Sequence, residues 1–357
     1  MTANSPLFDP IYLDHAATTP LLPAAREAMG VGFDVWANPS SPHGAGRAAR
    51  AALEDARARV KAALGWQGEV IFTSGASEAL ALVIGCSIKP LSAVSAVEHE
   101  AVLRLSGDAV RLSCDSGGLL NEAEVARPGL VAVQHANNET GVIQPISELA
   151  AAVRGAGGVL LADCAQTAGK LALPDADLIA ISAHKFGGPI GIGALLVRDW
   201  GLLQPGGGQE RGYRGGTENL PGALGMAAAL EAGRDWMAGA QHLRGKLDAA
   251  IVAGGGEVVA ATSPRVSGHR IATIAAYSMP GMTATAQLIR FDGMGIAVSA
   301  GSACSSGSLK TSHVLQAMGY AGAGEVIRVS IGRETTEREV DRFAAAWTTL
   351  AQGRAAA

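Results

Sequence analysis

Lys185 is placed where its amine could do covalent chemistry. It follows an apolar run at 178–181 almost directly, and a Gly-Gly-Pro sequence comes next at 187–189. A lysine that is buried at a strand end or lies near other cations has a lowered ammonium pKa, and its neutral amine can form a Schiff base with a carbonyl group. The alternative is an exposed loop lysine, so the interpretation depends on other segments.

A carboxylate, Asp163, ends a second apolar run at 159–162, about twenty residues before Lys185. Pyridoxal 5′-phosphate (PLP) is a cofactor that forms a Schiff base with a lysine. It needs a carboxylate facing its pyridinium nitrogen, because that ion pair keeps the ring an electron sink. Asp163 fits this position on a neighbouring strand, and the capping of a helix is an equal alternative.

Two glycine-containing segments could bind anions. Residues 73–78 (TSGASE) join an apolar run to a helical stretch, and backbone amides and hydroxyls at the start of a helix can cradle a phosphate. Many strand-to-helix turns contain Ser and Gly, so this motif alone is weak. Residues 206–217 (GGGQERGYRGGT) carry two arginines and end on Thr217. This segment is either a flexible connection or a place of anion binding or subunit contact.

The elements that would position these residues follow from the apolar runs. Helix-length segments separate the runs, a pattern typical of a mostly parallel sheet that is covered on both faces. The pattern predicts a large α/β domain over residues 16–240. The runs lie at 69–72, 93–97, 130–133, 159–162, 178–181 and 194–197.

The remaining sequence predicts a smaller α+β domain formed by residues 1–15 and 241–357. We expect one long helical region over 222–253, and a last helix capped by Thr335 or Thr336 ahead of two glutamates. Between them we expect strands at 270–274 and 327–330 and a helix near 284–290.

The composition is globular rather than disordered, with 48% hydrophobic and 17% charged residues over a length of 357. The net charge of −4 gives no basic footprint for nucleic acid. There is no run of about 18 apolar residues, and the N-terminus lacks a signal-peptide pattern. We therefore expect a cytoplasmic protein without nucleic-acid or membrane partners and with reduced thiols. The cysteines lack the paired spacing of a metal site, so no metal is expected; they are Cys86, Cys114, Cys164 and Cys304.

Together these segments resemble the class V aminotransferase family of PLP enzymes with fold type I, and within it the cysteine desulfurases of the NifS/IscS type. The resemblance runs along nearly the whole chain, so coincidence is very improbable. Its further matching segments are 12–20 (YLDHAATTP), 38–41 (NPSS), 98–102 (EHEAV), 135–141 (HANNETG) and 327–332 (IRVSIG). The implied fold is a large domain with a mostly parallel, seven-stranded type of sheet plus a smaller α+β domain.

The resemblance implies roles around the PLP ring. Lys185 would carry the cofactor as a Schiff base, and Asp163 would pair with the pyridinium nitrogen. His99 would stack on the ring. Gln166 and Asn138 would hydrogen-bond near its phenolic oxygen.

The resemblance also implies how phosphate and substrate are held. Thr217 would reach the phosphate from the other subunit, which implies a homodimer. Arg328 would bind the substrate carboxylate as a bidentate fork, and Asn38 would assist. The phosphate would otherwise be held by Ala76, Ser77, Ser182 and His184.

Cys304 sets the expected reaction. It lies in a Ser- and Gly-rich segment at 299–315, which is expected to leave the thiol accessible, and the resemblance places the catalytic cysteine there. The implied activity converts L-cysteine to L-alanine and leaves a persulfide on Cys304. Lys185 would remove the Cα proton, and His99 would move protons for a thiol. The sulfur would pass to an acceptor such as an iron–sulfur scaffold, a tRNA thiolation factor or a sulfur-carrier protein, for iron–sulfur cluster or thio-cofactor biosynthesis.

Four positions depart from the family pattern: His15, Ser77, Ile190 and Tyr213 stand where the family often has Asn, Thr, Lys and Arg. Ser77 keeps its hydroxyl, whereas the effects of the others are open. The alternatives within enzymes are a selenocysteine lyase, a cysteine β-lyase and, less favoured, an aminotransferase. An alternative from another class is a non-catalytic scaffold or persulfide carrier.

Overall fold

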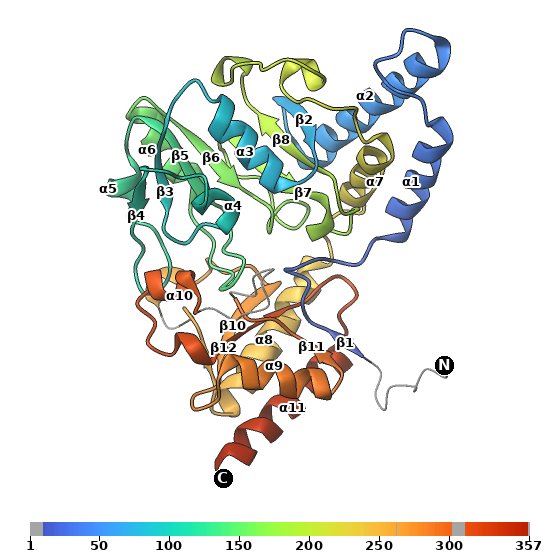
Figure 1. Cartoon of the computed structure of the whole chain (residues 1–357). Coiled ribbons are helices and arrows are strands. Elements are labelled where there is room, and N and C mark those ends of the chain that lie inside the picture. The colour runs from blue at the N-terminus through green and yellow to red at the C-terminus, as the bar shows by residue number, and fades with distance from the viewer. Residues whose placement is uncertain (1–9, 262, 302–310, 356–357) are drawn as a thin grey trace.

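A seven-stranded sheet forms the centre of the larger part of the molecule (Figure 1). The computed structural model describes residues 10–261, 263–301 and 311–355. The strand order is β2-β8-β7-β6-β5-β3-β4. Strands β3 to β7 run parallel, and β8 is antiparallel to both of its neighbours. The strands are β2 (Glu69–Thr73), β3 (Leu91–Ser95), β4 (Val110–Leu112), β5 (Gly129–Gln134), β6 (Gly158–Asp163), β7 (Leu178–Ser182) and β8 (Gly193–Val197). The mostly parallel sheet expected from the apolar runs is confirmed.

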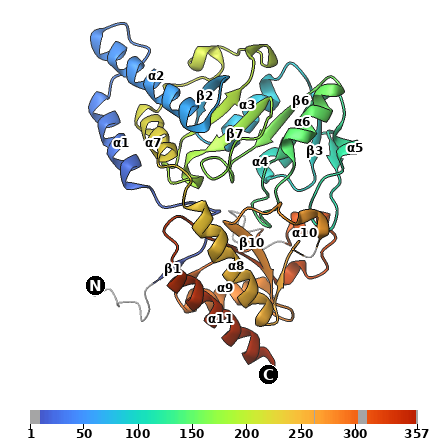
Figure 2. The same ribbon diagram turned by 180° about the vertical axis from the view of Figure 1, so that it is seen from behind.

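Helices cover both faces of this sheet, because successive side chains of each strand point to opposite faces and both sets are apolar. In β5, Leu130 and Ala132 pack with the helices of one face, and Val131 and Val133 pack with those of the other. The first face carries α3 (Ala76–Cys86) and α4 (Glu100–Leu103). The second carries α1 (Pro23–Val35), α2 (Gly44–Leu64), α6 (Ile146–Gly155) and α7 (Leu220–Glu231), as Figure 2 shows from behind. A single turn, α5 (Glu122–Val125), precedes β5.

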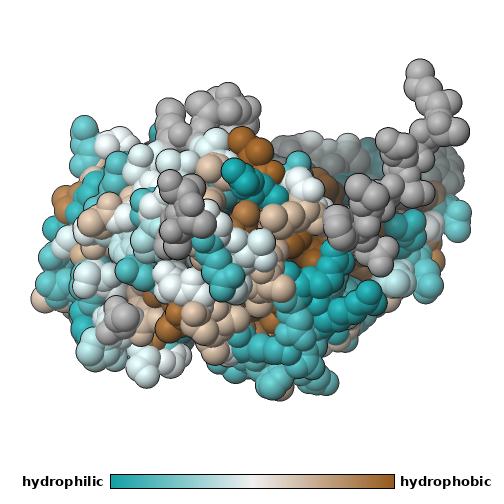
Figure 3. Space-filling view, turned by 90° about the horizontal axis from the view of Figure 1, so that it is seen from below, coloured by the Kyte–Doolittle hydropathy of each residue, from teal (hydrophilic) through white to brown (hydrophobic). Residues whose placement is uncertain are grey.

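The smaller part contains an antiparallel sheet in the order β12 (Val326–Ser330), β10 (Ile274–Ser278), β9 (Glu257–Val258). Near it, β1 (Ile11–Tyr12) pairs in parallel with β11 (Ile296–Ala297), so the N-terminal segment joins C-terminal elements. The helices are α8 (Met237–Ala253), α9 (Ala284–Gly293), α10 (His313–Ala317) and α11 (Glu337–Ala355). Fully buried aromatic rings fill its core: Tyr277, Phe291, Phe343 and Trp347. Seen from below, the outer face of this part carries many hydrophilic side chains with small apolar patches between them (Figure 3).

Two expected elements were wrong in their extent. The long helical region over 222–253 is two helices, because the chain turns at Gly233 with a positive φ of 73° between α7 and α8. The strand expected at 270–274 begins only at Ile274. The preceding residues instead bond to the larger part, where Ile271 N donates to Gly141 O (2.8 Å). Apolar or strand-forming residues run without a break from 271 into β10, so the local pattern could not show where the strand begins.

The cap of the last helix is confirmed at Thr336. Its backbone N–H donates to a side-chain oxygen of Glu339 (2.7 Å), and its hydroxyl accepts from the backbone N–H of Glu339 (3.3 Å). This reciprocal pair satisfies two donors at the start of α11. Among the helices that the structure describes, none is long and apolar enough to cross a membrane.

Candidate active site

Lys185 closes a single 3-10 turn (Ala183–Lys185) at the end of β7. All five residues of β7 are buried, so the strand fixes the position of this turn. The lysine Nζ atom donates hydrogen bonds to the backbone carbonyls of Ala16 (2.6 Å) and Ala17 (2.8 Å). The side chain is therefore held between the two parts of the molecule, and the alternative of an exposed loop lysine was wrong.

The surroundings of Lys185 favour its neutral amine. Burial is the largest cause and the positive charge of Arg328 the next, and together they lower the pKa of Lys185 to about 8. The carboxylates of Asp163 and Asp14 oppose this change. A neutral amine is thus accessible slightly above neutral pH, as Schiff-base chemistry and proton abstraction require.

A cavity of about 360 Å³ opens beside Lys185 at the carboxyl ends of β5, β6 and β7. Ligands of α/β proteins bind at this edge of the sheet, because the loops that follow the parallel strands converge there. Except for Thr217, every residue predicted to hold the cofactor lines this cavity. These residues are Ala76, Ser77, His99, Asn138, Asp163, Gln166, Ser182, His184 and Lys185.

One end of the cavity is suited to an anion. The helix α3 begins at Ala76, and no side chain caps its N-terminus, so backbone N–H groups of its first turn are available there. The hydroxyl-bearing residues Ser77 and Ser182 line the same end. Glu78 lies beside them and accepts a hydrogen bond from Ser74 N (2.5 Å), but its charge is neutralised by Arg214 (2.9 Å).

Asp163 is the last residue of β6 and lies in the cavity wall. One of its carboxylate oxygens accepts a hydrogen bond from Ala165 N (2.9 Å) within a turn, and no regular helix follows it before β7. The helix-cap alternative was therefore wrong. Burial raises the pKa of Asp163, and the Ala165 hydrogen bond and the charges of His99 and Lys185 oppose this rise. A buried carboxylate of this kind gains most from a cationic partner.

Two polar side chains complete the wall. The Nδ1 atom of His99 accepts a hydrogen bond from Ala101 N (3.1 Å), so in the neutral ring Nε2 carries the proton. Burial is the largest cause that lowers the pKa of His99, and Asp163 opposes it. Gln166 donates from Nε2 to Ala16 O (3.0 Å), while its buried Oε1 has no donor among the described residues. The Gln166 amide thus retains capacity for a further hydrogen bond.

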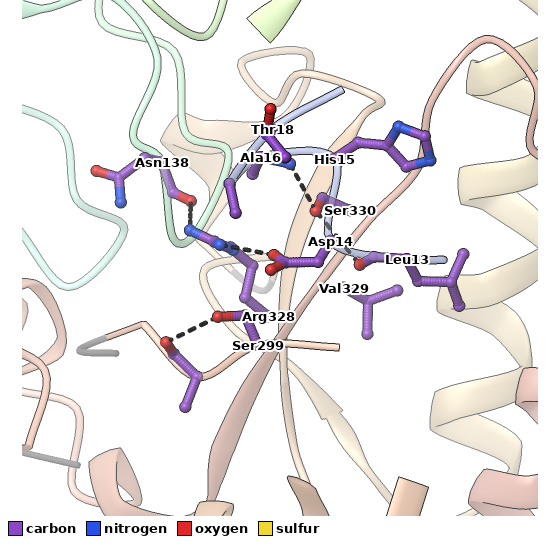
Figure 4. Close-up of polar contacts among 12 residues, drawn as sticks. Leu13, Asp14, His15, Ala16, Thr18, Asn138, Ser299, Arg328, Val329 and Ser330 are labelled. Carbon is purple, nitrogen blue, oxygen red and sulfur yellow. Dashed lines mark hydrogen bonds and ion pairs between the residues drawn. The ribbon is translucent and has the colours of Figure 1, made fainter. Parts of the chain in front are cut away.

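Arg328 lies in β12 and reaches toward the cavity wall (Figure 4). Its Nη1 donates to the backbone oxygen of Asn138 (3.0 Å), and its Nη2 pairs with an oxygen of Asp14 (2.8 Å). Its Nε atom is buried and has no acceptor in the described part of the chain. A buried guanidinium with an unused donor is a candidate for binding an anionic ligand.

Two predicted residues, Asn38 and Thr217, lie apart from this cavity. Asn38 is exposed between α1 and α2, where its side chain accepts a hydrogen bond from Ser40 N (2.8 Å). Thr217 is exposed after the glycine-rich segment and does not line the cavity. Cys304 lies outside the described residues. Two other thiols are not activated: burial raises the pKa of Cys114 to about 11, and it also raises that of Cys164.

The four residues that depart from the family pattern lie in different environments. Burial lowers the pKa of His15 to about 4, and Nδ1 of its ring has no partner among the described residues. Ser77 and Ile190 line the cavity, and Ile190 is 78% exposed. Tyr213 stacks on Trp200 with ring centroids 4.5 Å apart. Tyr213 therefore has a packing role within its own chain.

Sequence reasoning missed three residues close to the site. Asp14 pairs with Arg328, Lys170 is buried near Lys185, and Glu139 contacts both sides of the segment that contains Cys304. Asp14 and Glu139 fall in segments that carried the resemblance, so an acid within those segments was the available signal. Lys170 had none, because burial of a single lysine leaves no local pattern.

The sequence profile of the class-V aminotransferases, described as "Aminotransferase class-V", matches residues 11–343. The chain belongs to the aminotransferase class-V family. The family and the fold expected from the sequence are thereby confirmed, and so is PLP as the cofactor of this class V aminotransferase.

Curated relatives of this class V aminotransferase are cysteine desulfurases. The one from Cereibacter sphaeroides is 38% identical, with 93% of each chain covered. The one from Klebsiella pneumoniae is also 38% identical and covers 93% of this chain and 90% of its own. Among solved structures, a NifS-like protein from Rickettsia africae ESF-5 is similar, with a TM-score of 0.85 and 28% identity over 96% of this chain and 100% of that one.

The residues present fit PLP. The uncapped start of α3 suits a phosphate, and the buried Asp163 suits a pyridinium cation. The Gln166 amide has an unused polar atom, and Lys185 has the accessible neutral amine that a Schiff base requires. All four features surround one cavity.

Proposed function

We propose that this class V aminotransferase is a cysteine desulfurase that uses PLP on Lys185 and stores sulfur on Cys304. The reaction is L-cysteine plus the Cys304 thiol giving L-alanine plus a Cys304 persulfide. One observation carries the proposal: Lys185, Asp163 and the α3 N-terminus share one cavity, in a chain whose curated relatives are cysteine desulfurases. No observation favours a lyase or an aminotransferase over this reaction.

The residues of the cavity divide the work on the cofactor. PLP, when bound, supplies an electron sink for the pair left on the substrate carbon. Asp163 keeps the pyridinium cation charged, and the α3 amides with Ser77, Ser182 and His184 hold the phosphate. Lys185, as a neutral amine near its pKa of about 8, takes the substrate Cα proton.

The substrate carboxylate binds at Arg328. The side chain is buried beside Asn138, and its unused Nε donor supports an anion as the missing acceptor. Asp14 holds the other end of the guanidinium, so the fork is oriented before substrate arrives. Substitution of Arg328 or of Asp14 would therefore weaken cysteine binding more than cofactor binding.

The sulfur step uses the thiol of Cys304. The Cys304 thiolate attacks the substrate sulfur, the carbon–sulfur bond breaks, and its electron pair stays with the carbon fragment. That fragment gains a proton at Cβ, regains from Lys185 the proton lost at Cα, and leaves as alanine, while the new sulfur–sulfur bond is the persulfide. His99 moves a thiol proton in this step, because its Nε2 is the nitrogen that Ala101 does not engage.

The active unit is a homodimer in which Thr217 of one chain completes the phosphate site of the other. Apolar side chains are exposed near the end of α1 and at the cavity mouth, among them Phe33 (64%), Trp36 (80%) and Ile190 (78%). An apolar hollow of about 550 Å³, lined by Met29 and Ile190, lies between these regions. Apolar surface of this extent supports a covered interface. Asn38 follows Trp36 closely and would approach the partner's substrate there.

The persulfide sulfur then passes to an acceptor protein, such as an iron–sulfur scaffold or a sulfur carrier, for cluster or thio-cofactor biosynthesis. Capture of the persulfidated chain with its acceptors, followed by mass spectrometry, identifies the recipient.

Two variants test the proposal. Lys185→Ala is expected to abolish the visible absorbance band of the holoenzyme, because the covalent link is lost. Cys304→Ala is expected to keep that band and lose persulfide formation and at least about 100-fold of the alanine production. Cys86→Ala is the matched control and should behave as wild type, because Cys86 lies on the outer end of α3.

A full-intensity band in Lys185→Ala, or retained desulfuration in Cys304→Ala, would contradict these assignments. Direct release of sulfide at the wild-type rate by Cys304→Ala would favour a cysteine β-lyase. A strong preference for selenocysteine over cysteine would favour a selenocysteine lyase.

A further inference from the structure

Glu139 is a buried acid that has no part in holding PLP. It follows β5, is 4% exposed and does not line the cavity, although its neighbour Asn138 does. The side chain of Asn137 accepts hydrogen bonds from the backbone N–H groups of Glu139 and Thr140, at 2.9 Å each. This turn fixes the backbone from which the Glu139 carboxylate projects.

The Glu139 carboxylate contacts two segments of the smaller part of the molecule. The hydroxyl of Ser312 donates to its Oε2 atom at 2.5 Å. Gly301 lies against the same oxygen, since a Cβ atom at Gly301 would come within 1.9 Å of Oε2. Gly301 and Ser312 lie on either side of residues 302–310, and Cys304 falls within that range. One carboxylate therefore contacts the chain before and after the cysteine.

The segments around Gly301 and Ser312 each make further hydrogen bonds nearby. Ser299, just before Gly301, exchanges backbone hydrogen bonds with Arg328, at 3.1 and 2.6 Å. Ser312 caps α10 by accepting a hydrogen bond from Leu315 N (3.1 Å). These bonds set the local conformation of each segment. The Glu139 carboxylate contacts both Gly301 and Ser312. It projects from the segment whose Asn138 lines the cavity, so it joins both flanks of the cysteine to that segment.

Burial and the neighbouring groups act on the Glu139 carboxylate in opposite directions. Burial raises the pKa of Glu139, while the Ser312 hydrogen bond and the positive charges of His313 and Arg328 oppose the rise. His313 itself bonds through Nε2 to the backbone oxygen of Glu98 (2.9 Å), which ties α10 to the residue before His99. Burying a carboxylate with so few partners costs folding free energy, so stability by itself does not account for an acid at this position.

We propose that Glu139 is a positioning residue for Cys304: it fixes Gly301 and Ser312, on either side of the cysteine, against the segment that lines the PLP cavity. The inference rests on the proposed role of Cys304 as the sulfur acceptor. It assigns Glu139 to the sulfur step and not to cofactor binding or to proton removal by Lys185.

The test uses the holoenzyme with Glu139→Ala and the conservative Glu139→Gln. Glu139→Ala is expected to keep the visible absorbance band, to keep the cysteine-induced spectral change with KM within threefold, and to lose at least tenfold in kcat for alanine formation. Glu139→Gln is expected to recover much of kcat, because an amide oxygen can still accept from Ser312. Glu148→Ala, an exposed acid in the first turn of α6, is the matched control and should match wild type.

A double-mutant comparison separates positioning of Cys304 from a general structural effect. In a Cys304→Ala background, the residual alanine formation should be the same with Glu139 or with alanine there. An equal loss in both backgrounds, a lost absorbance band, or a raised KM with unchanged kcat would overturn the inference. If Glu139→Ala fails to fold, Ser312→Ala provides the same comparison, with a smaller fall in kcat expected.

The two proposals fail in distinguishable ways. Full activity of Cys304→Ala would overturn the proposed function whatever Glu139 does. An inactive Cys304→Ala together with a fully active Glu139→Ala would overturn only the positioning role.

Discussion

At the scale of single residues, Lys170 is a buried cation close to Lys185. Its side chain is 4% exposed, and no ion pair joins it to an acid within the described part of the chain. Burial, and then the charge of Lys185, lower the pKa of Lys170 to about 7. The charge of Lys170 in turn helps to lower the pKa of His15. Folding therefore works against protonation of Lys170.

This gives a pH dependence of stability with a definite sign. The folded pKa of Lys170, about 7, lies below the ordinary value of 10.5, so the unfolded chain binds more protons between these values and stability rises with pH across that window. We expect Lys170→Met to be more stable than wild type at pH 7.5, by roughly 2 kcal/mol, and to show a smaller rise in stability toward pH 9.5. Thermal unfolding at several pH values measures both effects.

The exposed Lys89 supplies the control for this measurement. Lys89→Met makes the same substitution at an exposed side chain, so its unfolding curves are the reference for those of Lys170→Met. An identical pH slope for Lys170→Met and wild type would show that Lys170 does not titrate in this range.

At the scale of elements, the phosphate end of the cavity depends on how closely β8 approaches the turn before α3. A Cβ atom at Gly193, the first residue of β8, would come within 2.6 Å of the Cα atom of Gly75 and 2.4 Å of Ile181 O. Both contacts are with backbone, so neither can move away cheaply. The antiparallel strand β8 therefore fixes the turn that offers its amides to the phosphate.

We expect Gly193→Ala to displace this turn. PLP binding should weaken at least tenfold, and unfolding free energy should fall by about 1–3 kcal/mol, the range for overpacked sites. A titration of PLP followed by visible absorbance and a thermal melt provide the two measurements. Gly85→Ala, in α3 with open space around its Cα, should bind PLP as wild type does. Equal PLP affinity in both variants would show that β8 does not set the phosphate turn.

At the scale of the whole molecule, the cavity lies where the two parts meet. Lys185 bonds to the carbonyls of Ala16 and Ala17, and Ser330 Oγ accepts from Ala16 N (2.8 Å), so the segment after β1 joins both parts. Figure 1 shows this segment crossing between them. The cavity nevertheless lacks Thr217 and Asn38, which the proposed second subunit would supply.

Mixed dimers test whether the second subunit provides Thr217. Lys185→Ala and Thr217→Ala chains, carrying different affinity tags, are co-expressed and the heterodimer is purified. If Thr217 acts across the interface, one site of the heterodimer has both residues, and half of the wild-type amount of PLP should bind with wild-type affinity. The Thr217→Ala homodimer should bind PLP about tenfold more weakly, as expected for loss of one hydrogen bond to a charged group. Affinity in the heterodimer no better than in that homodimer would place Thr217 within its own chain's site or outside any site.

The sequence anticipated the strands of the large sheet better than the boundaries elsewhere. Runs such as 159–162 and 178–181 are apolar on both faces because helices cover both, and that requirement is written locally in residue type. The start of β10 at Ile274 and the break at Gly233 were missed. They depend on which distant segment takes the hydrogen bonds, which local pattern does not encode.

The sequence by itself determined the types of chemical group in this protein. Its residues place a lysine and an acid after apolar runs, a Ser- and Gly-containing turn before a helix and a cysteine in a Ser- and Gly-rich segment, because these are properties of residue type and short-range order. Only the tertiary structure decided the surroundings of those groups. The pKa of Lys185, the partners of Arg328 and the contact of Glu139 with both Gly301 and Ser312 all join residues far apart in the chain. Burial and charge act through space, so these properties exist only once the chain is folded.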